Sequence, residues 1–266
     1  MIHALEDRGI ADKKVVVLND TVAALLAGLA QGQSFNALSY IGFILGTGTN
    51  MAYVEQNDNI GKLDGYLGAG SQVINVESGG AFKCGAADLR LDERNENPGG
   101  HVFEKMISGV YMGPLTLELL QALATEEVFS DAGGASLSIM KELSTIHIDN
   151  LAANNGRDIG VLGAEVFTHA DREIMKTVFT AVVDRAALMT AVNILAAVVK
   201  GGGGQDPARP VCMNIDGSTY YKTYQLVEKV QAHLTTLLAE RGLHIRCIQV
   251  DDAPVVGAAI AGLTTF

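Results

Sequence analysis

Short apolar runs of the β type dominate the first third of the chain. Strands are expected at 15–19, 41–45, 51–54 and 72–78. The tail of a helix, closed by Gly9, should precede them at 2–9. Another helix should begin at Asp20, because Asp20 and Thr21 are capping residues ahead of an alanine- and leucine-rich segment. The last three strands follow one another closely, which indicates an antiparallel meander.

The pattern later changes to a helical period. A helix is expected over 102–123, bent or restarted at Gly113 and Pro114, since proline removes a backbone donor. The longest periodic run, 164–200, predicts about 30 helical residues, which would span about 45 Å. The segment 79–100 shows no period, so we interpret it as an irregular crossover.

The carboxyl-terminal part predicts alternating strands and helices. After a glycine-rich surface loop at 201–209, a strand is expected at 210–215, a helix at 225–240 and a strand at 244–250. Strands joined through a helix pair in parallel. A meander followed by such units is a mixed α/β sheet flanked by helices, of the ribonuclease-H-like type, and we expect one domain over 1–266.

Composition narrows the class of protein. Hydrophobic residues are 48% of the 266 residues and charged residues 18%, as in a packed globular domain. The formal net charge of −11 argues against a nucleic-acid or anionic-membrane partner. Cys84, Cys212 and Cys247 have no CxxC spacing, so we expect neither zinc nor disulfides, and a cytoplasmic location. We find no signal-peptide core and expect no run of membrane-spanning length.

A glycine corner separates two of the predicted strands. Gly46 and Gly48 allow backbone N–H groups to approach an anion, and the hydroxyl of Thr47 adds a donor, so the corner could hold a nucleotide phosphate. An ordinary β-turn has the same signature, and a short glycine motif alone favours the turn.

A second corner repeats this chemistry after the strand at 210–215. It consists of Asp216, Gly217, Ser218 and Thr219. Its hydroxyls could donate to phosphate or ribose, or one of them could cap the next helix. The segment DAGGAS at 131–136 imitates a phosphate loop, but no apolar strand leads into it, so we expect a loop with Ser136 as a helix cap. The histidines are isolated, and no metal site is proposed.

Acidic and amide side chains lie where predicted elements begin or end. Asp20, beside Asn19, either caps its helix or acts as a base, and the helix N-terminus would favour its ionised form. Glu77 and Glu104 taken singly are solvated or capping acids. Together they suit a hydroxyl-rich ligand, because carboxylates accept hydrogen bonds from sugar hydroxyls. Asn50 could do the same with its amide.

These motifs, in this order, resemble those of the hexokinase family in the actin-like ATPase superfamily. The segments that carry the resemblance are VVVLNDTVAALLAG, IGFILGTGTNMAYVE, QVINVESGGAF, DERNENPGGHVFEKMISGVYMG, NIDGSTYY and GAAIAG. The NPG followed by FEKMISGVYMG is similar to the eukaryotic-type hexokinases and disfavours bacterial-type glucokinases and glycerol-type sugar kinases.

The resemblance implies ATP-dependent phosphorylation of a hexose, with glucose as the first candidate, at its 6-hydroxyl. Asp20 would be the base, and the hexose would be bound by Asn19, Asn50, Glu77 and Glu104. The second phosphate loop would comprise Gly46, Thr47, Gly48 and Thr49. The adenosine motif would comprise Asp216, Gly217, Ser218 and Thr219. Mg²⁺ would arrive with ATP.

The chain departs from the family pattern in two ways. Ser78 stands where the family usually has tryptophan after the glutamate, which affects the shape of the sugar pocket. Family members also carry a small lobe with a DxGGT phosphate loop, which nothing before Val15 supplies. The chain is therefore similar to the large lobe alone, with 1–20 a remnant of the small-lobe side. The strand at 15–19 would lack partners unless the chain forms homo-oligomers.

Two functions are compatible with this pattern. The first is the large lobe of a hexokinase, with very weak turnover or none in isolation, because catalysis in this family needs closure of both lobes. The second is a non-catalytic module that binds a hexose or a nucleotide.

Overall fold

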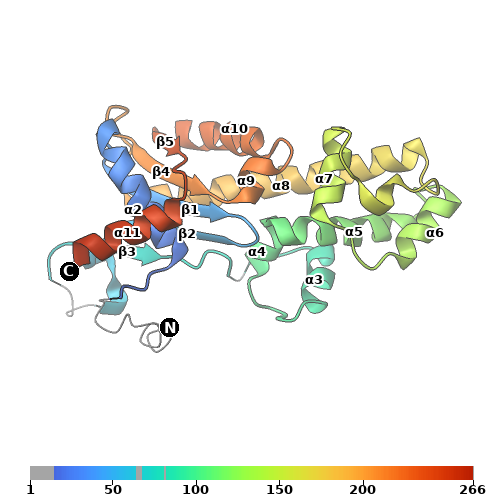
Figure 1. Ribbon diagram of the computed structural model, residues 1–266, viewed down its shortest axis with the longest axis horizontal. Helices are drawn as coiled ribbons and strands as arrows, with labels where there is room; N and C mark the ends of the chain where they lie inside the picture. The colour runs from blue at the N-terminus through green and yellow to red at the C-terminus, as the bar shows by residue number, and fades with distance from the viewer. Residues whose placement is uncertain (1–14, 64–67, 81, 266) are drawn as a thin grey trace, which may run out of the picture.

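A mixed five-stranded sheet forms the centre of the computed structural model, which describes residues 15–63, 68–80 and 82–265 (Figure 1). Its strands are β1 (Ser39–Leu45), β2 (Thr49–Gln56), β3 (Ser71–Asn75), β4 (Val211–Asp216) and β5 (Ile245–Ile248). In the order β3-β2-β1-β4-β5, the first three pair antiparallel, while β1, β4 and β5 pair parallel. The predicted meander and parallel units are confirmed. The helix tail expected at 2–9 lies outside the described residues.

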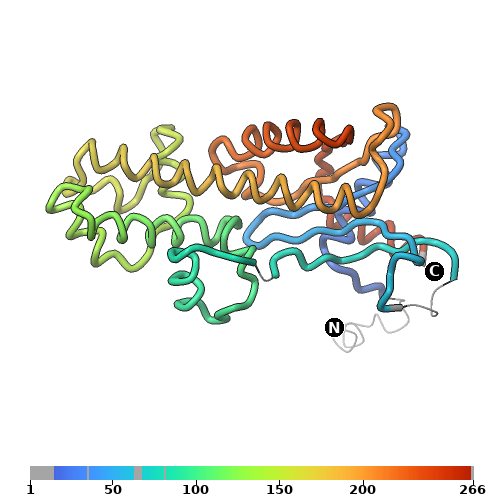
Figure 2. The backbone as a smooth tube through the Cα atoms, turned by 180° about the vertical axis from the view of Figure 1, so that it is seen from behind, coloured from blue at the N-terminus to red at the C-terminus, as the bar shows by residue number. Residues whose placement is uncertain are grey.

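Helices cover both faces of the sheet and extend beyond one end of it (Figures 1 and 2). They are α2 (Asp20–Gly32), α3 (Ala86–Glu93), α4 (Val102–Ile107), α5 (Gly109–Thr125), α6 (Asp131–Ile139), α7 (Thr145–Ala153), α8 (His169–Gly201), α9 (Ser218–Lys222), α10 (Leu226–Ala239) and α11 (Ala253–Thr265). α2, with α11 packed on it, covers one face, and α8, with α10 beside it, covers the other. α3 to α7 gather beyond the sheet along the first half of α8 (Figure 2).

Glycines let α2 lie very close to its neighbours. A Cβ on Gly42 of β1 would come 2.4 Å from the carbonyl oxygen of Thr21. α11 is seated on α2 in the same way, because a Cβ on Gly257 would lie 1.9 Å from the carbonyl oxygen of Ala23. These close approaches fix the start of α2 relative to the sheet.

α8 is the central helix of the fold. It is 33 residues long and apolar enough, by length and composition, to cross a membrane, so the expectation of no membrane-length run is wrong in that respect. Of its most apolar window, 56% is buried inside the structure. It packs on α10, α5 and α7, as the core helix of a folded domain does.

Two predictions of local structure are wrong. One segment lacks a neighbouring strand, and the other forms a helix that has little apolar periodicity. Residues 15–19 form no strand, and Val17 is 76% exposed, because an apolar run becomes a strand only beside another strand. The segment 79–100 contains helix α3, which has little apolar period. α3 buries Asp88 in a bidentate ion pair with Arg185 at 2.8 and 2.9 Å.

Two helix boundaries also differ from expectation. The break in 102–123 falls at Ser108, whose backbone is extended, while α5 continues through Gly113 and Pro114. The segment 131–136 is not a loop but the start of α6. The hydroxyl of Ser130 caps this helix by accepting the N–H of Gly133 at 3.2 Å.

Candidate active site

The glycine corners after β1 and β4 lie side by side. The two strands pair in parallel, with Ile44 opposite Asp216, so both corners leave the same edge of the sheet. Gly217 has a φ of 114°, which favours glycine, and a Cβ there would come 2.2 Å from the carbonyl oxygen of Leu45. The two corners therefore touch through backbone atoms.

The carbonyl oxygen of Gly46 ties both corners to α5. It accepts the hydroxyl of Thr219 at 2.6 Å and the N–H of Gly109, the first residue of α5, at 3.0 Å. Thr219 is buried at 7% exposure, so its hydroxyl fastens the junction. The break at Ser108 allows the N–H of Gly109 to reach this oxygen.

A cavity of about 920 Å³ opens beside the corners. Its wall includes the first turns of α5 and α7. From the predicted nucleotide-binding set, the lining residues are Thr47, Ser218 and Thr219. The basic side chains that line it are Arg94, Lys141, Arg157 and Lys222. The wall also carries Glu118, Glu142 and Asp149, and Glu118 is paired with Arg90 and Arg94. The hydroxyl donors and the remaining cations are the groups that suit a polyanionic ligand of nucleotide size.

The other predicted nucleotide-binding residues shape the corners and lie outside the cavity wall. The N–H of Gly46 donates to the carbonyl of Gly48 at 2.8 Å, which closes the first corner. The N–H of Gly217 donates to Oδ1 of Asp216 at 2.6 Å in the second. Thr49 is buried, and its hydroxyl donates to a carbonyl of β1 at 3.1 Å.

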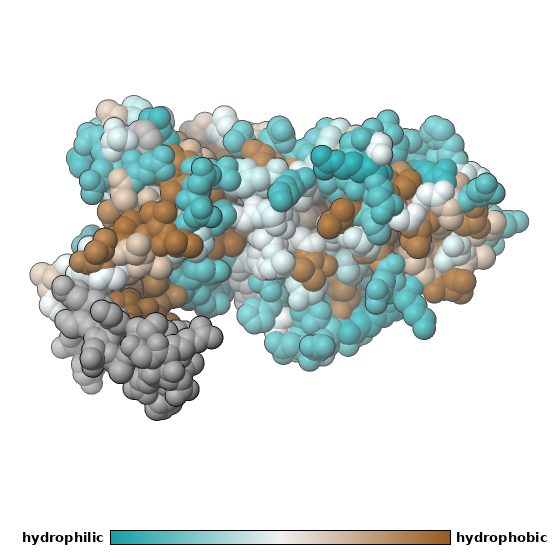
Figure 3. Space-filling model, in the orientation of Figure 1, coloured by the Kyte–Doolittle hydropathy of each residue, from teal (hydrophilic) through white to brown (hydrophobic). Residues whose placement is uncertain are grey.

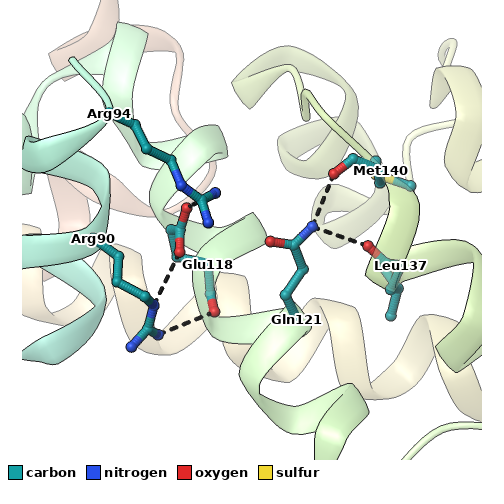
Figure 4. Close-up of polar contacts among 6 residues, drawn as sticks. All are labelled: Arg90, Arg94, Glu118, Gln121, Leu137 and Met140. Atoms are coloured by element: carbon teal, nitrogen blue, oxygen red, sulfur yellow. Dashed lines mark hydrogen bonds and ion pairs between the residues drawn. The ribbon is translucent and has the colours of Figure 1, made fainter.

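One wall of the cavity is braced by charge-assisted contacts between α3 and α5 (Figure 4). Glu118 of α5 is buried and accepts Arg90 Nε at 3.1 Å, and it also pairs with Arg94. On the same helix, Gln121 donates to two carbonyls at the end of α6, those of Leu137 at 3.0 Å and Met140 at 2.8 Å. Helix α5, which forms part of the cavity wall, is thus linked to both α3 and α6.

Asn50 lies outside the cavity wall, with two other predicted hexose-binding residues, Asn19 and Glu77, around it. Its Nδ2 lies 2.9 Å from Thr21 Oγ1, 3.4 Å from Asn19 Oδ1 and 3.5 Å from Glu77 Oε1. Asn19 also caps α2 by accepting the N–H of Thr21 at 2.9 Å. The start of α2, the start of β2 and the segment that follows β3 thereby form one polar cluster.

Glu104 and Asp20 complete the predicted set. Oε2 of Glu104 accepts the N–H of Thr49 at 2.9 Å, and a Cβ on Gly48 would come 2.5 Å from this oxygen. Glu104 therefore packs against the first corner. Asp20 is exposed in the first turn of α2, where its Oδ1 accepts the N–H of Thr21 at 2.8 Å. Its Oδ2 stays available to a ligand.

Ser78 lies against the same cluster. Its backbone N–H approaches Asn50 Oδ1 at 3.4 Å, while its hydroxyl is buried without a hydrogen-bond partner among the described residues. The position that differs from the family pattern thus adjoins the predicted hexose-binding residues.

The sequence patterns did not reveal several residues of the polar cluster around Asn50 and of the cavity lining. Thr21 and Asn75 join the polar cluster, and their signal was their position beside Asp20 and Glu77 in the segments NDT and NVE. The basic residues of the cavity come from separate segments that share no motif. A local pattern could not have found them.

The first corner connects these two groups. Thr47 lines the cavity, while Asn50, three positions later, is the centre of the carboxylate and amide cluster. A cavity for a polyanion beside acceptors for a polyol, on a ribonuclease-H-like sheet, defines the class of sugar kinases with the actin-like ATPase fold.

Comparison with known proteins gives the family within this class. The hexokinase family model matches residues 40–264. Hexokinase-like 1 protein of Arabidopsis thaliana is 32% identical over 277 residues, covering 98% of this chain and 55% of that protein. Glucokinase-1 of Kluyveromyces lactis is 30% identical, covering 97% of this chain and 60% of that protein. The chain belongs to the hexokinase family, and it spans about half the length of the curated relatives it matches.

Solved structures agree on the fold. Hexokinase from Schistosoma mansoni, in complex with glucose, superposes with a TM-score of 0.81 at 24% identity, covering 98% of this chain and 60% of that one. Another hexokinase crystal structure gives 0.77 at 28% identity, covering 98% and 57%. The predicted fold class is confirmed.

Proposed function

We propose that the chain is the large lobe of an ATP-dependent hexokinase that phosphorylates the 6-hydroxyl of a hexose, with glucose as the first candidate. The observation that carries the proposal is the corner at 46–48, which connects the cavity to the polar cluster around Asn50. Family membership supports sugar phosphorylation in general. The Schistosoma mansoni hexokinase was solved with glucose, which supports the choice of sugar.

Asp20 is the proposed base for the 6-hydroxyl. It is exposed at the N-terminus of α2, where the helix dipole stabilises a carboxylate. The proton would pass to Asp20 as the hydroxyl oxygen attacks. Asn19, Asn50, Glu77 and Glu104 would orient the hexose by hydrogen bonds to its other hydroxyls.

The cavity fits ATP by the chemistry of its lining. Thr47 and Ser218 present hydroxyls at the corners, and Lys141 and Lys222 bring positive charge to the wall. ATP would supply the transferred phosphoryl group, and Mg²⁺ bound to its phosphates would neutralise their charge. Gly217 would contribute indirectly, because it lets the second corner pack against the first and so holds Ser218 at the cavity wall.

We propose further that full activity requires a second, smaller lobe. The relatives are longer than this chain, which covers 55% to 60% of the proteins named above. Closure of a small lobe would exclude water and complete the phosphate clamp. A cytoplasmic location and homo-oligomerisation of the isolated chain are parts of the same proposal.

The test is a coupled glucose-phosphorylation assay of the chain joined to the small lobe of a relative. Asp20→Ala should lower kcat by about 100-fold to 10,000-fold, the usual contribution of a general base. Asp58→Ala is the matched control, an exposed aspartate outside the site, and it should leave kcat unchanged. Undiminished activity of the Asp20→Ala variant would refute the proposal. The 266 residues alone should show very weak turnover or none.

The second candidate is a non-catalytic module that binds hexose or nucleotide. It is favoured by Ser78, which leaves a buried, unsatisfied hydroxyl beside the hexose cluster. Calorimetry of the 266-residue chain tests this candidate, because a binding module must release or absorb heat with glucose or ATP in the absence of a second lobe. The coupled assay distinguishes the two candidates, since a non-catalytic module would show no turnover when joined to a small lobe.

A further inference from the structure

Asn75, at the end of β3, bridges two of the proposed hexose-binding residues. Its Oδ1 accepts Asn50 Nδ2 at 2.8 Å, and its Nδ2 donates to Glu77 Oε1 at 2.7 Å. Asn75 is itself exposed, so it contributes little to the hydrophobic core.

The side-chain amide of Asn50 can donate only two strong hydrogen bonds. An amide nitrogen carries two hydrogens. The two shortest contacts of Asn50 Nδ2, to Thr21 Oγ1 at 2.9 Å and Asn75 Oδ1 at 2.8 Å, use both of them. Its Oδ1 accepts the N–H of Met51 at 2.7 Å. Asn50 is thus held in one orientation by its neighbours.

The carboxylate of Glu77 is held by a direct hydrogen bond from Asn75. Glu77 lies two residues after β3, and its backbone has a φ of 52°, in the left-handed region, so the chain turns there and sets the direction of the side chain. The hydrogen bond from Asn75 engages Oε1 and leaves Oε2 for a ligand. A bond to a carboxylate is about twice as strong as one between neutral groups.

We propose that Asn75 is a positioning residue of the hexose site. It aims the carboxylate of Glu77 at the sugar and locks the amide of Asn50. The proposal rests on the proposed function, because it assigns Asn75 a role in hexose binding. It predicts that affinity for hexose depends on the donor group of residue 75.

The experiment is a ¹H–¹⁵N NMR titration of the 266-residue chain with glucose. Asn75→Ala should weaken the affinity about tenfold, since it removes one charge-assisted hydrogen bond. Asn75→Asp keeps an acceptor for Asn50 but places a negative charge beside Glu77. It should weaken the affinity more, by about a hundredfold, because the second carboxylate repels Glu77 and offers it no donor.

Three control measurements accompany the titration. Gln72→Ala, on the same strand, should leave the affinity unchanged, because Gln72 contacts Asn57 and not the cluster. The melting temperature should be the same for all variants. The side-chain amide signals of Asn50 should shift in both Asn75 variants without glucose, which reports the bridge itself.

The outcomes separate the two proposals. Absence of glucose binding by the parent chain would refute the hexose-binding lobe and this inference with it. Parent binding with equal affinity in the Asn75 variants would overturn only the positioning role. Equal loss in the Ala and Asp variants would also overturn it, since a role that does not depend on the donor group of residue 75 predicts that result.

Discussion

Single glycines decide how the two corners of the site meet. Gly109 is the clearest case, because a Cβ there would lie 2.1 Å from Thr219 Oγ1 and 3.3 Å from the carbonyl oxygen of Gly46. The hydroxyl of Thr219 would have to abandon its 2.6 Å bond to Gly46. A residue without a side chain is therefore required at the start of α5 for steric reasons.

Gly109→Ala is expected to destabilise the chain by about 2 to 3 kcal/mol, the cost of a buried clash with loss of a hydrogen bond. In a Thr219→Ala background the same change should cost clearly less, since the obstructing hydroxyl is gone. Urea unfolding of the two single variants and the double variant measures this. Gly262→Ala, with nothing within 4 Å of its Cβ, is the control. Strict additivity of the two changes would contradict the steric explanation.

At the scale of elements, buried acidic side chains hold some helices together. Such contacts leave no apolar pattern in the sequence. Asp171 in the first turn of α8 accepts the N–H of Ser130 at 2.8 Å and that of Thr168 at 2.8 Å, as well as both hydroxyls. It joins the start of α6 to the start of α8. Burial raises the pKa of Asp171, but the hydrogen bonds together have the larger effect and lower the pKa to about 2.

Asp171→Asn should therefore lower the melting temperature at neutral pH by about 5 to 10 °C, the effect of about 2 to 3 kcal/mol in a chain of this size. The pKa of Asp171 is depressed by folding, so its contribution is present above about pH 4. It is lost as the pH falls from about 4 to about 2. Thermal unfolding should show the gap between variant and parent closing over that range. A gap that persists at pH 2, or one equalled by the exposed control Glu165→Gln, would contradict this.

The elements that the sequence predicted correctly are those with their own periodicity. The meander from β1 to β3, the long α8 and the parallel β4 and β5 all carry an apolar pattern that is independent of distant residues. α3 could not be predicted, because its buried Asp88 depends on Arg185 in α8, far along the chain. The strand expected at 15–19 needed a neighbour that the described residues do not provide.

The site divides in the same way. Asn19, Asn50 and Glu77 could be proposed from the sequence because each lies beside a predicted strand or helix, or at the end of one. Asn75 could not be assigned a role, because its function as a bridge exists only once β2 and β3 are paired. Lys141 and Lys222 could not be recognised as a pair from the sequence, because the segment before α7 and the end of α9 meet at one cavity only in the folded chain.

At the scale of the whole molecule, the cavity is lined by residues of α5, α7 and α9, so it joins segments from across the chain. These helices lie where the sheet meets the group of helices beyond it (Figure 1). Asp149 of α7 accepts the N–H of Tyr224, between α9 and α10, at 2.8 Å. A ligand in the cavity would contact both sides at once. Apolar surface, by contrast, collects over α11 at the opposite end (Figure 3), where Val255 is 70% and Leu263 84% exposed.

Mg²⁺–ATP at 100 times its Kd should raise the melting temperature of the 266-residue chain by about 5 °C or more, because it binds only the folded state. Lys222→Glu, which reverses a charge in the cavity wall, should abolish most of this increase. Lys83→Glu makes the same change of net charge outside the wall and should preserve it. Differential scanning calorimetry gives the comparison, and an equal increase in both variants would place the nucleotide elsewhere.

The separation of the polar cluster from the cavity has a kinetic consequence. Asn50 and Glu77 lie outside the wall of the cavity, which Thr47 lines. A sugar and a nucleotide bound as proposed would therefore contact different residues of this lobe. Because the two ligands would not compete for the same residues, a compulsory order of addition measured in a complete enzyme is expected to originate in the closing lobe.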